Sequence, residues 1–121
     1  YAWRSMLEAK VPLAFGSDFP VEEVEPLLGL AAATLRADAD GYPTGGWNPW
    51  QRLTTAQALS AFTAGAAFAA FEENVAGALT IGKRADFIVL SDDPLAISAA
   101  DLRDVRVEMT VVGGRVVFDA P

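Results

Sequence analysis

Asp18 is the residue whose type and setting in this sequence point most directly to chemistry. It follows the apolar run Leu13-Ala14-Phe15 after a turn of two small residues. A strand buried on both faces reads as a continuous apolar run, and in parallel α/β sheets and barrels the reactive groups lie at the carboxyl ends of such strands. The pattern predicts a buried strand over residues 13–15, with Asp18 placed to bind a metal, activate water or cap a helix. The alternative is a turn residue whose side chain accepts backbone N–H bonds.

Three further carboxylates, Glu22, Glu23 and Glu25, follow Asp18 closely. Two carboxylates that face one cleft about 5–10 Å apart can hydrolyse a glycosidic bond, so a carboxylate glycosidase is one hypothesis. The competing interpretation is structural. Pro26 suits the first position of a helix, and the helix dipole favours negative charge just before it.

Aromatic residues gather in a loop rich in glycine and proline, residues 38–50, which contains Tyr42, Trp47 and Trp50. Long ordered loops in compact domains are often functional, so these side chains could line a substrate pocket. They could equally anchor the loop on the hydrophobic core.

The composition excludes several classes of function. The chain contains neither histidine nor cysteine, which removes disulfides and thiolate ligands. Its formal net charge is -7 and its only adjacent basic pair is Lys83-Arg84. Nucleic-acid binding needs a basic stripe, so we expect no nucleic-acid partner. No apolar run approaches the roughly 20 residues of a membrane span, and no secretory signal is visible. We therefore expect no membrane partner and a cytoplasmic location.

Helices dominate the first part of the predicted fold. Apolar spacing predicts helices over residues 2–9 and 26–36, and a third over residues 54–71. Thr54 and Gln57 have the spacing of a capping box at the start of the third helix.

Short strands dominate the second part. We expect strands over residues 77–82, 85–90, 105–111 and 115–118, with a possible helical turn over residues 98–102. Gly113-Gly114 predicts a two-residue hairpin turn. The change of composition near Ala76 suggests two parts, residues 1–76 and residues 77–121.

Several motifs spread over nearly the whole chain carry a resemblance to a known family. They are Gly16-Ser17-Asp18-Phe19-Pro20-Val21, Pro26-Leu27-Leu28-Gly29-Leu30, Gly46-Trp47-Asn48-Pro49, Gln51-Arg52-Leu53-Thr54, Thr63-Ala64-Gly65-Ala66-Ala67, Gly77-Ala78-Leu79, Gly82-Lys83-Arg84-Ala85-Asp86-Phe87-Ile88-Val89-Leu90 and Thr110-Val111-Val112-Gly113-Gly114-Arg115-Val116-Val117. In order and spacing these motifs resemble the C-terminal part of amidohydrolase-3 type metal-dependent hydrolases, members of the amidohydrolase superfamily.

The resemblance implies an α/β fold: the last strand and helices of a (β/α)8 TIM barrel, followed by half of a small, mostly antiparallel β-sandwich. Residues 13–15 would be the eighth barrel strand, and residues 80–118 the C-terminal half of the sandwich. Asp18 would contact a divalent metal, expected to be zinc, and take the proton from the attacking water. The implied activity is hydrolysis of a carbon–nitrogen bond of a small-molecule substrate.

The chain departs from the family pattern because the other metal ligands of the family are mainly histidines on earlier barrel strands. A chain without histidine cannot supply them. We therefore expect the terminal fragment of an enzyme, inactive alone, which self-associates or packs on a missing N-terminal portion. The alternative hypothesis is a non-catalytic α/β module that binds a partner.

Overall fold

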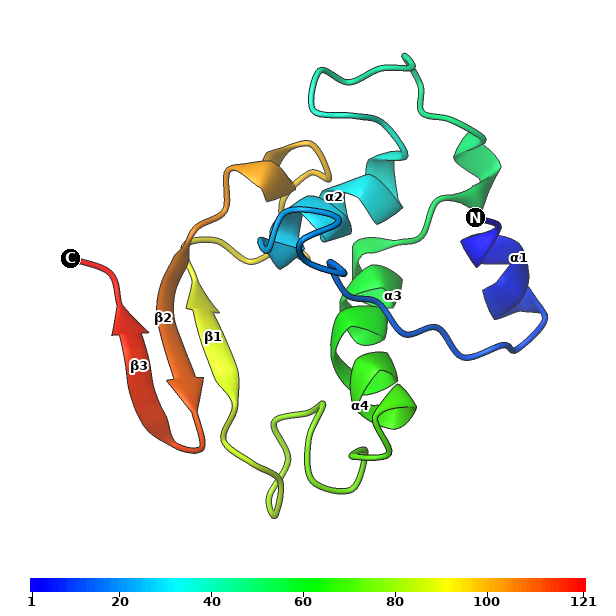
Figure 1. The fold of residues 1–121 in the computed structure, drawn as a ribbon. Coiled ribbons are helices and arrows are strands. Elements are labelled where there is room, and N and C mark those ends of the chain that lie inside the picture. Colours follow the sequence, from blue (N-terminus) through cyan, green and yellow to red (C-terminus); the bar gives the residue numbers. More distant parts are fainter.

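Helix α2 (Pro26–Leu35) lies at the centre of the computed structural model, which describes residues 1–121. A second helical unit packs beside it, and a three-stranded antiparallel sheet lies on one side (Figure 1). Helix α1 (Trp3–Glu8) lies on the opposite side from the sheet. This confirms an α/β fold with a small antiparallel sheet.

Local capping defines the two ends of α2, and the sequence indicates the first of them. Glu25 is the N-cap, and its side chain accepts the N–H of Leu27 at 3.3 Å, while Pro26 occupies the first helical position. At the other end Arg36 adopts the left-handed conformation, with φ of 55°, and its N–H donates to the carbonyl of Ala32. The helix thus stops one residue before the predicted end.

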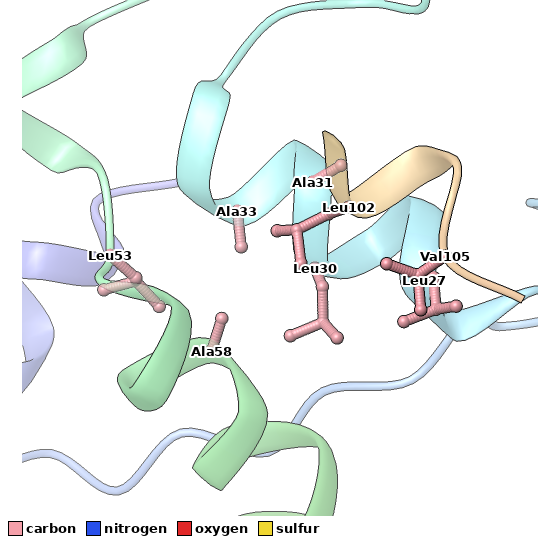
Figure 2. Close-up of a cluster of buried hydrophobic side chains, with 8 residues drawn as sticks. All are labelled: Leu27, Leu30, Ala31, Ala33, Leu53, Ala58, Leu102 and Val105. Atoms are coloured by element: carbon pink, nitrogen blue, oxygen red, sulfur yellow. The ribbon is translucent and has the colours of Figure 1, made fainter. Parts of the chain in front are cut away.

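A compact core forms around α2 from one face of that helix, the start of α3 and the 3-10 turn η3 (Asp101–Arg103), as Figure 2 shows. Leu102 is completely buried and brings the second part of the chain against the first. The eight buried core residues are Leu27, Leu30, Ala31, Ala33, Leu53, Ala58, Leu102 and Val105.

The third predicted helix is one continuous helical stretch with a wide turn in its middle. It comprises α3 (Thr55–Ser60), the π-helical segment η2 (Ala61–Gly65) and α4 (Ala66–Ala69). The predicted capping box is confirmed: the hydroxyl of Thr54 accepts the N–H of Gln57, and the side chain of Gln57 accepts the N–H of Thr54.

Replacing Thr54 by alanine should lower the free energy of unfolding by about 1 kcal/mol, because the N–H of Gln57 loses the hydroxyl that caps it. Urea unfolding checks this as a lower midpoint with an unchanged slope. Thr55→Ala is the matched control, since the Thr55 side chain makes no hydrogen bond and alanine is the better helix former. Equal midpoints for the two variants would contradict the capping role.

The predicted strand over residues 13–15 is wrong. Leu13 and Phe15 are half-buried, but this segment is extended chain with no strand beside it. A strand needs a neighbouring backbone to pair with, and here the N–H of Phe15 donates instead to the carbonyl of Ala61, in the π turn, at 3.0 Å. The eighth strand of a barrel is therefore not formed within this chain.

The sheet has the order β1-β2-β3 and consists of β1 (Phe87–Leu90), β2 (Val107–Val112) and β3 (Arg115–Asp119). Val89 pairs with Met109 and Val112 with Arg115, and both ladders contain a register shift. The predicted hairpin turn is confirmed, with φ of 55° at Gly113 and 76° at Gly114.

The expected strand over residues 77–82 is also wrong. Gly77 and Gly82 both have positive φ, no strand pairs with this segment, and Ile81 is fully exposed. The expected turn near residues 98–102 forms slightly later, as η3. The boundary near Ala76 between residues 1–76 and 77–121 stays a prediction. None of the helices is both long and apolar enough for a transmembrane span.

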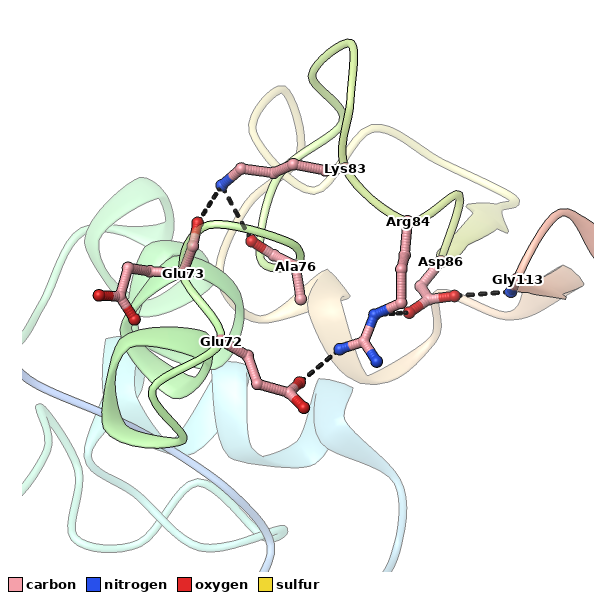
Figure 3. A network of polar contacts seen from close by, with 7 residues as sticks. All are labelled: Glu72, Glu73, Ala76, Lys83, Arg84, Asp86 and Gly113. Atoms are coloured by element: carbon pink, nitrogen blue, oxygen red, sulfur yellow. Dashed lines mark hydrogen bonds and ion pairs between the residues drawn. The ribbon is translucent and has the colours of Figure 1, made fainter.

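The segment Lys83–Asp86 fastens the end of the helical unit to the sheet (Figure 3). Lys83 donates from its ammonium to the carbonyls of Glu73 and Ala76 at 2.7 and 2.9 Å. Arg84 pairs with Glu72 and with Asp86, and Asp86 accepts the N–H of Gly113 in the hairpin turn at 2.7 Å. The only adjacent basic pair of the sequence is thus used by the fold.

Candidate functional site

Asp18 lies in a turn that the backbone closes without its side chain. The N–H of Val21 donates to the Asp18 carbonyl at 2.8 Å, and the N–H of Phe19 donates to the hydroxyl of Ser17. The Asp18 carboxylate is exposed and makes no hydrogen bond or ion pair with the protein. The ordinary turn role, in which this side chain accepts backbone N–H groups, is therefore wrong, and the carboxylate is available to a ligand.

The backbone of Asp18 is held in an uncommon conformation, with φ of 55°. Non-glycine residues at positive φ are uncommon, and among them Asp and Asn are several-fold enriched. Upstream, the segment is anchored by Phe15, whose ring lies 5.2 Å from that of Trp3 and 5.5 Å from that of Phe62. The turn therefore extends from a packed segment and not from a free terminus.

The other acidic residues do not gather around Asp18. Glu25 is occupied as the N-cap of α2, and Glu22 and Glu23 are exposed. No group of three or more Asp and Glu side chains in the structure is placed to hold a metal ion. A divalent metal needs several ligands at fixed distances, so the residues of this chain alone do not fit such a site. They offer at most the single carboxylate of Asp18.

Trp47 anchors the aromatic loop. Its backbone carbonyl accepts the Nε–H of Arg36 at 2.7 Å, and the Arg36 guanidinium lies 5.2 Å from its ring and 5.0 Å from the ring of Trp3. The side chains of Tyr42, Trp47 and Trp50 are nevertheless all largely exposed, at 72%, 57% and 69%. The loop is therefore held through the backbone carbonyl of Trp47 and the contact of its ring with Arg36, and not by burial of an aromatic side chain in the hydrophobic core.

Three arginines hold this loop through backbone carbonyls, and sequence reasoning missed them. Besides Arg36, the guanidinium of Arg52 donates to the carbonyls of Leu35 and Gly45. Arg103, from η3, donates to three successive carbonyls, those of residues 37, 38 and 39. The sequence could not reveal these contacts, because every residue has a backbone carbonyl and no acidic partner marks the arginines that bind one.

Arg36 is the most buried charged residue, with 9% of its surface exposed. Desolvation by this burial lowers the pKa of the Arg36 guanidinium below its ordinary value. The group still stays protonated at neutral pH, because an arginine guanidinium does not lose its proton in proteins. The loop is thus organised around a fixed positive charge.

A wide apolar groove of about 850 Å³ lies between the α3–η2–α4 unit and the sheet. Phe62 and Ala66 line its helical wall, and Ile88 and Val112 line its sheet wall. Only 13 of the 121 residues are buried, and Val116, Val117 and other apolar side chains of the sheet remain exposed. The apolar surface is therefore larger than this chain covers by itself.

Comparison with known proteins identifies the class. The sequence profile described as the amidohydrolase family matches residues 1–118, and this chain belongs to that family. YtcJ of Bacillus subtilis (strain 168), which bears the name of an amidohydrolase, is 34% identical over 119 residues, which are 98% of this chain and 22% of YtcJ.

Two further relatives are similar in extent. Protein LONG AFTER FAR-RED 3 of Arabidopsis thaliana is 35% identical over 98% of this chain and 20% of its own length. N-substituted formamide deformylase of Arthrobacter pascens is 32% identical over 92% of this chain and 20% of its own length. The chain thus spans about one fifth of the curated relatives it matches.

A solved structure supports the fold. The crystal structure of an amidohydrolase from Thermotoga maritima MSB8 superposes with a TM-score of 0.63 at 22% identity, over 97% of this chain and 26% of that chain. At this identity the likeness concerns the fold of the shared segment.

Proposed function

We propose that this chain is the C-terminal part of a longer amidohydrolase that uses water to hydrolyse a carbon–nitrogen bond of a small molecule. Family membership and the amidohydrolase relatives support a hydrolase. The name of the Arthrobacter relative, a deformylase of N-substituted formamides, favours the amide-type bond. The share of the relatives that the chain covers supports a longer protein.

We assign the role of general base to Asp18, and the observation that supports this assignment is its free carboxylate. It is exposed, takes no part in the fold and lies on a turn with φ of 55° that extends from a packed segment. Uncommon backbone conformations of this kind cluster at functional sites. An ionised carboxylate can accept the proton of an attacking water and so act as general base.

The divalent metal expected from the family, zinc in the first instance, stays part of the proposal. Since this chain supplies one carboxylate and no cluster, the remaining ligands must come from the rest of the protein. We also propose that the rest of the protein covers the apolar groove between the helices and the sheet, and that the isolated chain self-associates through it. A cytoplasmic location stays a prediction.

Amine release from a panel of N-substituted formamides and simple amides tests the proposed function. We expect the complete protein to hydrolyse at least one of them, and the 121-residue chain with added zinc to hydrolyse none, because a single carboxylate does not make a catalytic centre. Turnover by the 121-residue chain alone would overturn the assignment of this chain as a part. A complete, folded protein inactive on the whole panel would overturn the reaction class.

A further inference from the structure

Phe15 is held in place by its backbone and by two aromatic neighbours. Its N–H donates to the carbonyl of Ala61 at 3.0 Å. Its ring lies 5.2 Å from the ring of Trp3 and meets the ring of Phe62 edge-on at 5.5 Å. Only Gly16 and Ser17 separate this residue from Asp18, so the place of Phe15 decides where the Asp18 turn begins.

The π-helical segment η2 supplies two of these contacts. Ala61 and Phe62 are its first two residues: the former offers its carbonyl to the Phe15 N–H, and the latter offers its ring to the Phe15 ring. Single π turns inside α-helices are frequent at functional sites. Here the π turn is the part of the helical unit that contacts the segment leading to the proposed general base.

The place of the Phe62 ring depends in turn on Gly29 of α2. A Cβ at position 29 would lie 2.5 Å from Cζ of Phe62, so the missing side chain makes room for the tip of the ring. Phe62 also packs against the hydrophobic core around α2. A rigid ring that touches α2 at its tip and Phe15 edge-on transmits the position of the core helix to the segment before Asp18.

We propose that Phe62 is a positioning residue for Asp18, because it fixes the ring of Phe15 and thereby the turn that carries the carboxylate. This inference rests on the proposed role of Asp18 as general base. A displacement of about 1 Å at a reacting group can cost about 100-fold in rate, so the support behind such a group matters. Edge-to-face aromatic pairs suit this task, since they have a preferred geometry beyond their apolar burial.

Phe62→Leu in the complete protein tests the proposal. Leucine keeps an apolar side chain at the core but removes the ring that meets Phe15. In steady-state amine release, kcat and kcat/KM should fall together by about 10- to 100-fold, with KM within about twofold of the wild type. The two constants fall together because a misplaced base weakens the transition state and leaves substrate binding unchanged.

Val105→Ala is the matched control. Val105 belongs to the same core and is buried, so its truncation also removes apolar contacts and lowers the thermal midpoint. It lies after η3 and far along the chain from the π turn. Measured well below its midpoint, this variant should keep the wild-type kcat. An equal loss of kcat in Phe62→Leu and Val105→Ala would assign the loss to general destabilisation and overturn the proposal.

The Asp18→Asn background separates positioning from any other role of Phe62. If Phe62 acts by placing the carboxylate, Phe62→Leu should change the residual rate of Asp18→Asn by less than about twofold, because the base to be placed is already gone. The full loss carried into the double variant would overturn the positioning role. Wild-type kcat in Asp18→Asn alone would overturn the role of Asp18 and this proposal with it, so the two failures are distinguishable.

Gly29→Ala reaches the same ring from the other side and leaves every core side chain in place. The new methyl group must push the tip of the Phe62 ring, whereas alanine is the better helix former, so the thermal midpoint should change little. We expect kcat to fall by about tenfold with KM unchanged. Should Phe62→Leu fail to fold, a wild-type kcat in Gly29→Ala would overturn the proposal by itself.

Discussion

Asp18→Asn in the complete protein should lower kcat by about 10²- to 10⁴-fold, the range of a lost general base. Asparagine keeps the size and shape of the side chain but cannot accept a proton at neutral pH. It also tolerates positive φ, so the turn with φ of 55° is retained. The Asp18 side chain makes no hydrogen bond in the fold, so the thermal midpoint should stay within about 2 °C of the wild type.

Asp40→Asn is the matched control. Asp40 is also an exposed loop carboxylate whose side chain makes no hydrogen bond, so its loss changes the net charge equally. We expect wild-type kcat for this variant. The measurements are steady-state amine release and circular dichroism melting on both proteins. Equal kcat values for the two variants would show that Asp18 takes no part in the reaction. A large drop in the thermal midpoint of Asp18→Asn would show that the residue contributes to folding.

The elements that the sequence predicts correctly are those whose determinants are local. The capping box at Thr54, Pro26 at the start of α2 and the Gly113-Gly114 hairpin each depend on residues within a few positions of one another. The alternation along residues 105–111 also survives: Val105 and Val111 are buried while Arg106 is exposed. Local hydrogen bonds and side-chain period are enough to specify them.

The two wrong strands failed because strand formation depends on a partner that local sequence does not name. Residues 13–15 have the apolar run of a buried strand, but the available partner in this chain is the helical carbonyl of Ala61. Residues 77–82 contain two glycines at positive φ and have no partner strand. A segment with a propensity for β-structure forms a strand only where another backbone segment pairs with it through hydrogen bonds.

For the candidate site, sequence could single out Asp18 but not its surroundings. Only the structure shows that the Asp18 carboxylate accepts no backbone N–H. The N–H of Phe19 donates to the hydroxyl of Ser17 instead. The sequence did not indicate the role of Arg36, because Trp3 and Trp47, whose rings flank its guanidinium, lie far from it in the sequence. Contacts between residues far apart in the chain require the folded structure.

Gly65→Ala should destabilise the protein by about 3 kcal/mol, a large effect for a single methyl group. Gly65 has helical φ and ψ of -65° and -42°, so alanine at an open helical site would be stabilising by up to about 1 kcal/mol. Here a Cβ would lie 3.2 Å from the carbonyl carbon of Leu13 and closer still to its oxygen. Steric overlap with backbone outweighs helix propensity, because the backbone cannot rotate away as a side chain can.

The close approach at Gly65 is also what holds the segment before Asp18 against the π turn. The N–H of Phe15 bonds to Ala61 one turn earlier in η2, so a methyl group at position 65 must displace residues 13–15 or break that bond. We therefore expect a thermal midpoint lower by about 10 °C, given the usual relation between stability and midpoint for a chain of this size. In the complete protein kcat should fall as well, because Asp18 shifts with its segment.

Gly16→Ala is the matched control for this effect. It lies in the same segment, a Cβ there meets no atom within 4 Å, and its φ is not positive. Its midpoint should equal or slightly exceed that of the wild type, since alanine restricts the unfolded chain. A Gly65→Ala midpoint as high as that of Gly16→Ala would show that residues 13–15 do not pack on the π turn in solution. Asp18 would then have lost the support that places it.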